Sequence, residues 1–195
     1  MTSGTKEKIL REAQHLIHMN GFRATSVDAI AKASGVKKAN VFYYFPTKEA
    51  LGLELLDRMA TYILDNMLAP VFANDRHPEE QIRDYVRLIR TGLEDGNCQG
   101  GCPLGNMALE MADVDEAFRT RLVRFFEDLG SLIEGALQRG LEKGLYRETL
   151  DPSATAAFIV SSVQGAIMLA KTKREPEALA HAETQLVTLL ESYQE

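Results

Sequence analysis

The chain has 195 residues, of which 45% are hydrophobic and 26% charged, a globular composition that excludes a low-complexity or repeat architecture. Its net charge of -6 is unevenly spread: residues 1–58 hold nine basic and six acidic side chains, a balance of +3, which leaves -9 for the remainder. A basic first part on an acidic remainder predicts that one end of the protein meets a polyanion.

The ends and the cysteines indicate the compartment. The first dozen residues are charged and helical in pattern, so no secretory signal is expected. With only two cysteines, we expect a reducing cytoplasm and no structural disulfide. The uncharged run at residues 152–170 approaches the length of a membrane span, but it carries five Ser, Thr or Gln side chains. We therefore predict a buried interface helix and no membrane contact.

Hydrophobic periodicity predicts four helices in the first part of the chain, at residues 5–20, from Thr25 to Gly35, at residues 37–44, and at residues 47–68. Pro46 closes the third helix and Pro70 ends the fourth. Two short helices joined at Gly35 cannot each bury a core, and Val36 and Val41 can pin one against the other. The pattern predicts a helix-turn-helix within a three-helix domain at residues 1–50, linked by the helix at residues 47–68.

The remaining residues, 51–195, predict a second helical domain, with no strand in the chain. Its helices are expected near residues 82–93, 107–113, 115–143, 153–172 and 177–193. Two of them carry more apolar or small side chains than one domain needs, which predicts a homodimer built as a four-helix contact. The residues assigned to that interface are Phe118, Leu122, Phe125, Leu129, Ala157, Ser161 and Gly165. A monomer with thick packing is the alternative.

Residues 37–44 have the chemistry of a helix that reads DNA. Lysines and a helix start favour phosphate oxygens, an asparagine amide can pair with adenine, and a small alanine lets the helix enter the major groove. Four consecutive aromatics cannot all face one core, so at least one must point outward. The candidate DNA contacts are Thr25, Ser26, Lys37, Lys38, Ala39, Asn40, Tyr43, Tyr44 and Lys48.

Residues 5–58, and above all the stretch TSVDAIAKASGVKKANVFYYFPTKEAL, resemble the DNA-binding domain of the TetR family of bacterial transcriptional regulators. The resemblance implies an all-helical homodimer that binds a pseudopalindromic double-stranded operator, most often as a repressor, and releases it when a small ligand enters the second domain. Many members have glycine in place of Ala39 and tyrosine in place of Phe42. These departures mean that the operator sequence does not carry over.

The loop CQGGCPLGN holds Cys98 and Cys102, separated by three residues. Zinc needs further ligands, and His77 is not at a metal-type spacing, so no metal is expected. A thiol placed before a helix start can be activated by the helix dipole, which makes Cys102 a candidate sensor of reactive electrophiles. Some branches of the TetR family resemble this stretch and respond to such molecules. A small buried cysteine that only packs explains the same residues.

For a reversible ligand, methionine and aromatic side chains suit an adaptable apolar cavity, although they also fill any helical core. Together with Cys98 and Cys102, the candidate ligand residues are Met67, Tyr85, Ile89, Met107, Met111, Phe125 and Met168. We find no catalytic constellation and expect neither an enzyme nor a cofactor. An activator, a helical enzyme and an interaction module without DNA binding are the alternatives to a ligand-controlled repressor.

Overall fold

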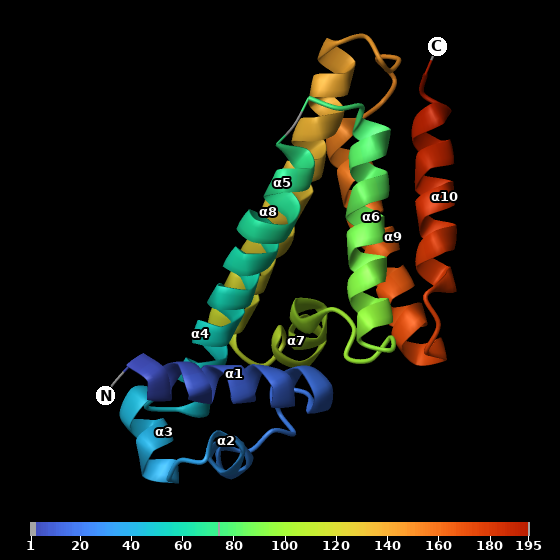
Figure 1. Ribbon diagram of the computed structural model, residues 1–195. Coiled ribbons are helices and arrows are strands. Elements are labelled where there is room, and N and C mark those ends of the chain that lie inside the picture. Colours follow the sequence, from blue (N-terminus) through green and yellow to red (C-terminus); the bar gives the residue numbers. More distant parts are fainter. Residues whose placement is uncertain (1–2, 74, 195) are drawn as a thin grey trace. The chain divides into compact units, whose positions relative to one another are not determined.

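The computed structural model describes residues 3–73 and 75–194, and every regular element within these ranges is a helix (Figure 1). The expectation of an all-α fold is confirmed. The elements in chain order are α1 (Ser3–Asn20), α2 (Val27–Ser34), α3 (Lys38–Tyr44), α4 (Lys48–Thr61), the π-helix η1 (Tyr62–Leu68), α5 (Ala69–Phe72), α6 (Pro78–Asp95), α7 (Pro103–Met111), α8 (Glu116–Glu142), α9 (Pro152–Lys173) and α10 (Glu177–Glu191).

The helices form two compact units. The first, here called the head unit, takes in the chain up to Ala60 together with Pro103–Leu122. The second, the body unit, takes in Thr61–Cys102 and the chain from Val123 onward. This division differs from a boundary at residue 50, because α7 and the start of α8 pack with the first sixty residues. A sequence pattern read along the chain does not reveal such a return.

Within the head unit, α1, α2 and α3 pack around one small core. Ile9, Ala13, Ile30, Val41 and Phe45 are each at most 2% exposed and supply its apolar contacts. Burying five such side chains excludes water from the centre of the domain, which stabilises α2 and α3, two helices too short to be stable alone. The predicted three-helix domain is therefore present.

A continuous helical stretch runs from α4 through η1 into α5. Thr47 caps it as predicted, since its Oγ1 accepts the backbone N–H of Ala50 at 3.0 Å. The prediction that Pro70 ends the helix is wrong, because the helical stretch continues to Phe72. Proline lacks the N–H that an α-helix interior needs. Here Pro70 falls in the first turn after the π-helix, where a missing N–H is tolerated.

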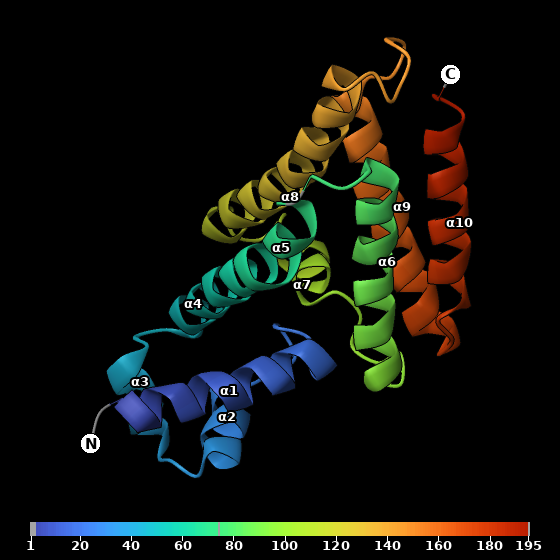
Figure 2. The ribbon, with the colours of Figure 1, turned by 45° about the horizontal axis from the view of Figure 1, so that its top comes forward.

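In the body unit, α6, α9 and α10 lie side by side (Figures 1 and 2). Leu179, Leu186 and Leu190 on α10 are buried in this packing. Glu183 is also buried, and it accepts a bond from Arg87 Nε at 2.9 Å and one from Arg90 at 3.4 Å. A buried carboxylate needs such partners, so α10 is fixed to α6 by charge as well as by apolar packing.

The apolar stripe of α8 faces the interior of the protomer. Phe118, Leu122, Phe125 and Leu129 are each at most 3% exposed. Their assignment to a dimer interface is wrong, because side chains already buried within one chain have no surface left to offer a partner. The spacing of four and three residues marks a buried face but does not say what buries it.

The outer face of α9 is different. Ala157 and Ser161 are exposed and Gly165 is half-buried, and the same helix carries Phe158 and Met168 with 55% and 57% of their surface exposed. The helix is long and apolar enough to cross a membrane by length and composition, and 39% of its most apolar stretch is buried. An α9 of this composition therefore has one side in the protomer core and one apolar side uncovered.

Candidate functional site

The turn between α2 and α3 is set by Gly35. This residue has φ of 63°, the left-handed conformation that glycine adopts without strain, and its N–H closes α2 by bonding to carbonyls of Ala31 and Lys32. The N–H of Val36 then bonds to the Ala31 carbonyl at 3.0 Å. This tight exit brings α3 back onto α2, as the helix-turn-helix pattern predicted.

The side chains of α3 separate into a buried and an exposed set. Val41 is 1% exposed, and Phe45, just after the helix, is 2% exposed. Tyr43 is 78% exposed, and its ring meets the half-buried Tyr44 edge-on at 5.0 Å. Phe42 is 40% exposed. At least one outward aromatic was predicted, and Tyr43 is the most exposed of the four.

The other exposed residues are those expected to meet DNA. Lys37, Lys38, Ala39 and Asn40 are all exposed at the start of α3. A solvent-facing helix with ammonium groups, an amide and one small residue has donors for phosphate oxygens and for a base edge. The arrangement is suited to a nucleic acid and offers no enclosed space for a small molecule.

Asp28 is a neighbour of the candidate site that the sequence did not predict. Its Oδ2 accepts a bond from Lys38 Nζ at 2.8 Å, with the two side chains 68% and 50% exposed. The sequence offers one signal for this pair, an acidic residue in the first turn of α2. In the protein without DNA, one candidate phosphate contact is thus already paired.

Thr25 does not have the predicted role. It is 3% exposed, and its hydroxyl donates to the Gly21 carbonyl at 2.7 Å, with the Leu16 carbonyl at 3.3 Å. A buried hydroxyl that is already donating has nothing to offer a phosphate, so Thr25 is a structural contact to the end of α1. The cap of α2 lies one residue later, at Ser26, whose Oγ accepts the N–H of Ala29 at 3.1 Å.

Lys48 is also engaged inside the head unit. Its Nζ donates to the Arg23 carbonyl at 3.2 Å and lies 4.7 Å from the centre of the Phe22 ring. Burial lowers the pKa of Lys48, and the carboxylates of Glu49 and Glu110 partly offset that effect. Lys48 therefore helps to hold the turn after α1.

The cysteine loop of the body unit has an unusual backbone. Asn97 and Cys98 have φ of 52° and 53°, and Gly100 and Gly101 follow with 76° and 74°. Left-handed conformations at two consecutive non-glycine residues are uncommon. Cys98 is 2% exposed and Cys102 is half-buried, and both are thiols. The loop is therefore tightly turned and leaves Cys102 the more accessible of the two.

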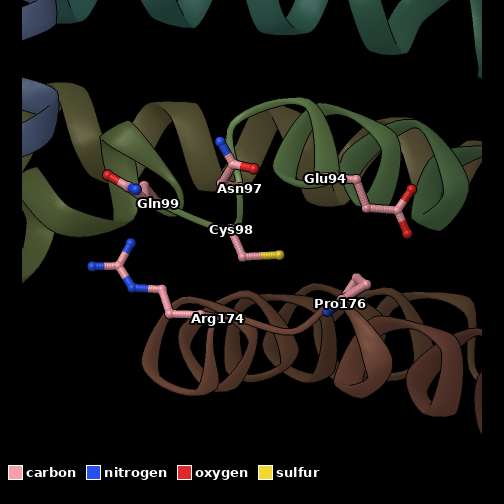
Figure 3. A pocket seen from close by; sticks show the side chains of 6 residues that line it. All are labelled: Glu94, Asn97, Cys98, Gln99, Arg174 and Pro176. Carbon is pink, nitrogen blue, oxygen red and sulfur yellow. The ribbon is translucent and has the colours of Figure 1, made fainter.

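A solvent-open pocket of about 610 Å³ lies against this loop, and Figure 3 shows the side chains around it. Cys98 is the one predicted ligand residue in its wall. The lining residues are Glu94, Asn97, Cys98, Gln99, Arg174 and Pro176. These polar groups differ from the apolar cavity expected from the sequence.

The predicted ligand residues do not share one environment. Tyr85 and Phe125 are buried in the body unit, with Met67 and Ile89 half-buried there, whereas Met107 and Met111 are buried in the head unit. Met168 is 57% exposed, so it does not belong among the buried candidates. Methionine spacing alone could not separate core from surface.

Tyr85 differs from the other candidates in its hydrogen bonding. The residue is 1% exposed, and its hydroxyl has no hydrogen-bond partner among the described residues. Burial raises the pKa of Tyr85, and the neighbouring Cys102 raises it further. A buried hydroxyl without a partner costs about 1–3 kcal/mol, so this atom can accept a new partner at a gain.

Within residues 3–73 and 75–194, no group of three or more His, Cys, Asp or Glu side chains could hold a metal ion. The sequence predicts no metal site because His77 does not stand at a metal-type spacing from Cys98 and Cys102.

Comparisons with known proteins bear on both units. A family model described as "Bacterial regulatory proteins, tetR family" matches residues 9–55, and one described as "Tetracyclin repressor-like, C-terminal domain" matches residues 78–186. The two matches cover the helix-turn-helix and most of the later helices. The second alone covers more than half of the chain.

Two relatives and one solved structure extend the match to nearly the full chain. An uncharacterized HTH-type transcriptional regulator in the lacX 3' region of Lactococcus lactis is 29% identical over 90% of this chain and 87% of its own length. The HTH-type transcriptional repressor DhaR of Mycobacterium sp. strain GP1 is 26% identical over 89% and 86%. The crystal structure of regulatory protein TetR from Rhodobacter sphaeroides has a TM-score of 0.88 at 24% identity, covering 95% and 98%.

Proposed function

Because the chain belongs to the TetR family of bacterial transcriptional regulators, we propose that it is a cytoplasmic, ligand-responsive repressor that binds a pseudopalindromic operator as a homodimer. As a regulator of this family, it is not an enzyme. Repression, as opposed to activation, is supported by the relative DhaR, which is named a transcriptional repressor. Release of the operator follows binding of a small molecule or modification of a thiol.

The exposed face of α3 carries the proposal. Lys37, Lys38, Ala39 and Asn40 face solvent while Val41 anchors the helix to the core. The lysines bind phosphates, Asn40 pairs with a base edge, and Ala39 lets the helix approach the groove floor. Tyr43 adds a hydroxyl for the backbone. Each of these groups is available in the free protein except Lys38, which exchanges Asp28 for a phosphate.

The experiment compares the parent with Lys38→Ala and Asn40→Ala on operator sites selected from genomic DNA. Both variants should lose at least tenfold in affinity with folding and oligomeric state unchanged, since these side chains are exposed. Lys38→Ala should weaken binding on all sequences, and Asn40→Ala chiefly on the preferred site. Lys173→Ala, an exposed lysine on α9, is the matched control. Parent-like binding by both variants would refute α3 as the reading helix.

The outer face of α9 is the proposed dimer contact. Small residues at Ala157, Ser161 and Gly165 let a second helix approach closely, and exposed Phe158 and Met168 supply apolar area around them. Phe158→Arg should give monomers by sedimentation. Operator affinity should fall as well, because the two protomers that bind the two half-sites are then no longer joined. Gln185→Arg, on the exposed side of α10, adds the same charge as a control. A Phe158→Arg dimer would place the interface elsewhere.

Tyr85 and Cys102 mark the proposed ligand site in the body unit. The unpartnered Tyr85 hydroxyl would donate to an acceptor atom of the ligand, and the apolar surroundings would hold the rest. Tyr85→Phe keeps the ring and should be at least as stable as the parent. The same variant should resist release from the operator by extracts or compounds that release the parent. Equal release of both would remove Tyr85 from the site.

Thiol modification is the second proposed route of release. In the test with iodoacetamide, the Cys102 thiolate displaces iodide and forms a thioether, while the thiol proton passes to solvent. Loss of operator binding in the parent but not in Cys102→Ser would make Cys102 the sensor. Loss of binding in both, or in neither, would leave Cys102 as a packing residue.

The release step is proposed to act through α4 and η1, where the chain passes from the head unit to the body unit at Ala60–Thr61. A π-helical stretch is a frequent site of adjustment in helices. Half-sites on DNA are about 34–36 Å apart for one helical turn, so a shift of a few ångströms in the two reading helices lowers affinity. Spin-label distances between the two α3 helices should change on release, and constant distances would contradict this step.

A further inference from the structure

Glu110 makes two hydrogen bonds across a long sequence separation. It lies at the C-terminal end of α7, and its Oε1 accepts the backbone N–H of Phe22 at 3.2 Å while its Oε2 accepts that of Arg23 at 2.9 Å. A carboxylate at a helix C-terminus is electrostatically unfavourable within its own helix. The compensation comes from these two N–H donors, which lie in the turn after α1 in the same head unit.

The turn is shaped to receive the carboxylate. Gly21 has φ of 92°, and a Cβ at this position would lie 2.5 Å from Glu110 Oε1. Any other residue would be strained and would push the carboxylate away. Gly21 therefore permits both the reversal of the chain and the close approach of the acceptor, and the two N–H groups of Phe22 and Arg23 point to one side chain.

The opposite side of the turn is held as well. Lys48 donates to the Arg23 carbonyl, and its ammonium lies over the Phe22 ring. Phe22 is 2% exposed, and its ring centre is 5.1 Å from that of Phe118 on α8. Gly52 on α4 leaves the space for both rings, since a Cβ there would collide with each. Residues 21–24 are thus fixed between α4, α7 and α8.

This turn leads directly into α2 and α3. Thr25 follows it and bonds back to Gly21, Ser26 caps α2, and α2 packs against α3. We propose that Glu110 is a positioning residue for DNA binding: by holding the Phe22 and Arg23 amides it sets the orientation of α2 and α3. The proposal rests on the function proposed above, and it adds α7 to the elements on which operator affinity depends.

The same contact gives α7 a role in release. The helix begins at Pro103, the residue after Cys102, so the chain links the candidate thiol to Glu110 through a single short helix. Displacement of α7 would withdraw the carboxylate from the turn. The amides of Phe22 and Arg23 would then lose their acceptor, and α2 would lose its fixed starting point.

Charge and positioning predict opposite signs for Glu110→Gln. Removing a negative charge from a DNA-binding unit should, by electrostatics alone, raise affinity for DNA slightly. A glutamine keeps the size of the side chain but offers one acceptor and one NH₂ group, which faces a backbone N–H and repels it. If Glu110 positions the turn, operator affinity falls. A weaker variant therefore cannot be explained by the change of charge.

The experiment measures operator affinity by fluorescence anisotropy for the full-length parent, Glu110→Gln, and the control Asp113→Asn. Asp113 is exposed just after α7, so its variant removes the same charge without touching the turn. We expect Glu110→Gln to bind about tenfold more weakly, the equivalent of about 1.4 kcal/mol, at every salt concentration. Asp113→Asn should bind as the parent does or slightly better. Parent-like or tighter binding by Glu110→Gln would overturn the proposal.

Amide hydrogen exchange in the free protein supplies a second readout that does not depend on DNA. The Phe22 and Arg23 amides should exchange at least tenfold faster in Glu110→Gln than in the parent, while the Ile30 amide inside α2 stays protected. Faster exchange of these two amides with unchanged operator affinity would refute the proposal that Glu110 positions α2 and α3 for DNA binding. If the parent binds no operator at all, the proposed function fails, and the exchange result still decides whether Glu110 holds the turn. Should Glu110→Gln not fold, Glu110→Asp, which keeps the charge but shortens the reach, takes its place with the same expectations.

Discussion

The ion pair between Asp28 and Lys38 allows a prediction in which a substitution improves DNA binding. Lys38 is a proposed phosphate contact, yet in the free protein its ammonium is 2.8 Å from the Asp28 carboxylate. Binding DNA must therefore break or share this pair. It must also bring the Asp28 charge close to phosphates of the same sign. Asp28→Asn removes both effects while keeping the shape of the side chain.

The magnitude follows from exposure. An ion pair with side chains 68% and 50% exposed is worth about 0.2–1 kcal/mol in the free protein. Repulsion between Asp28 and a phosphate at roughly 8 Å in water adds about 0.5 kcal/mol. Together they give about 1 kcal/mol per protomer, or about 2 kcal/mol for two protomers on one operator. The expected gain in affinity is about thirtyfold.

The predicted gain in operator affinity is tested by fluorescence anisotropy across a series of salt concentrations. Asp28→Asn should bind the operator more tightly at low salt and show a steeper salt dependence, because Lys38 now neutralises a phosphate fully. Asp113→Asn, exposed in the same unit, controls for net charge. The reasoning is refuted if Asp28→Asn binds no better than Asp113→Asn. Urea unfolding should show a small loss of stability, since an acidic residue in the first turn of α2 is removed.

Two further predictions concern stability. Thr25→Val should lower the free energy of unfolding in urea by about 0.5–1.5 kcal/mol, because it removes the hydrogen bond from the buried Thr25 hydroxyl to the Gly21 carbonyl, which keeps only the Thr25 backbone N–H as a donor. Operator affinity well below the unfolding temperature should change little. A large loss of affinity at unchanged stability would restore a DNA contact for Thr25. Burial raises the pKa of the Glu79 carboxyl above its ordinary value of 4.5, so the folded state holds the proton more tightly than the unfolded state does. Stability should therefore decline as the pH rises from that value through the folded pKa, and Glu79→Gln should flatten this decline in a pH series of unfolding curves; an unchanged series would contradict the assignment.

Local patterns were sufficient to predict the turn before α3 and the side of α3 that is buried. Gly35, Val41 and Phe45 act within a few residues of one another, so their spacing determines the turn and the buried face of α3. The same local patterns began α2 at Thr25, whereas its cap is Ser26 and its first helical residue is Val27. Thr25 and Ser26 both carry hydroxyls. The structure distinguishes them by their hydrogen bonds: Thr25 donates to the Gly21 carbonyl, whereas Ser26 caps α2.

Contacts between distant segments could not be predicted. Glu110 meets Phe22 across 88 residues, and nothing in its neighbourhood in the sequence marks that partner. The stripe on α8 was correctly expected to be buried, but Phe118 and Leu129 are covered by their own protomer and not by a second one. For the ligand residues, Tyr85 stands out through a missing hydrogen bond, which no sequence pattern encodes.

Selection of binding sites from fragmented genomic DNA by the reduced, full-length protein tests the central claim most directly. We predict enrichment of sites with two inverted half-sites whose centres are about one helical turn apart, bound with an affinity that falls steeply as salt rises. Recovered sites should lose binding to Asn40→Ala. An absence of enriched sites, or affinity that does not depend on salt, would contradict the assignment of α3 as a DNA-reading helix.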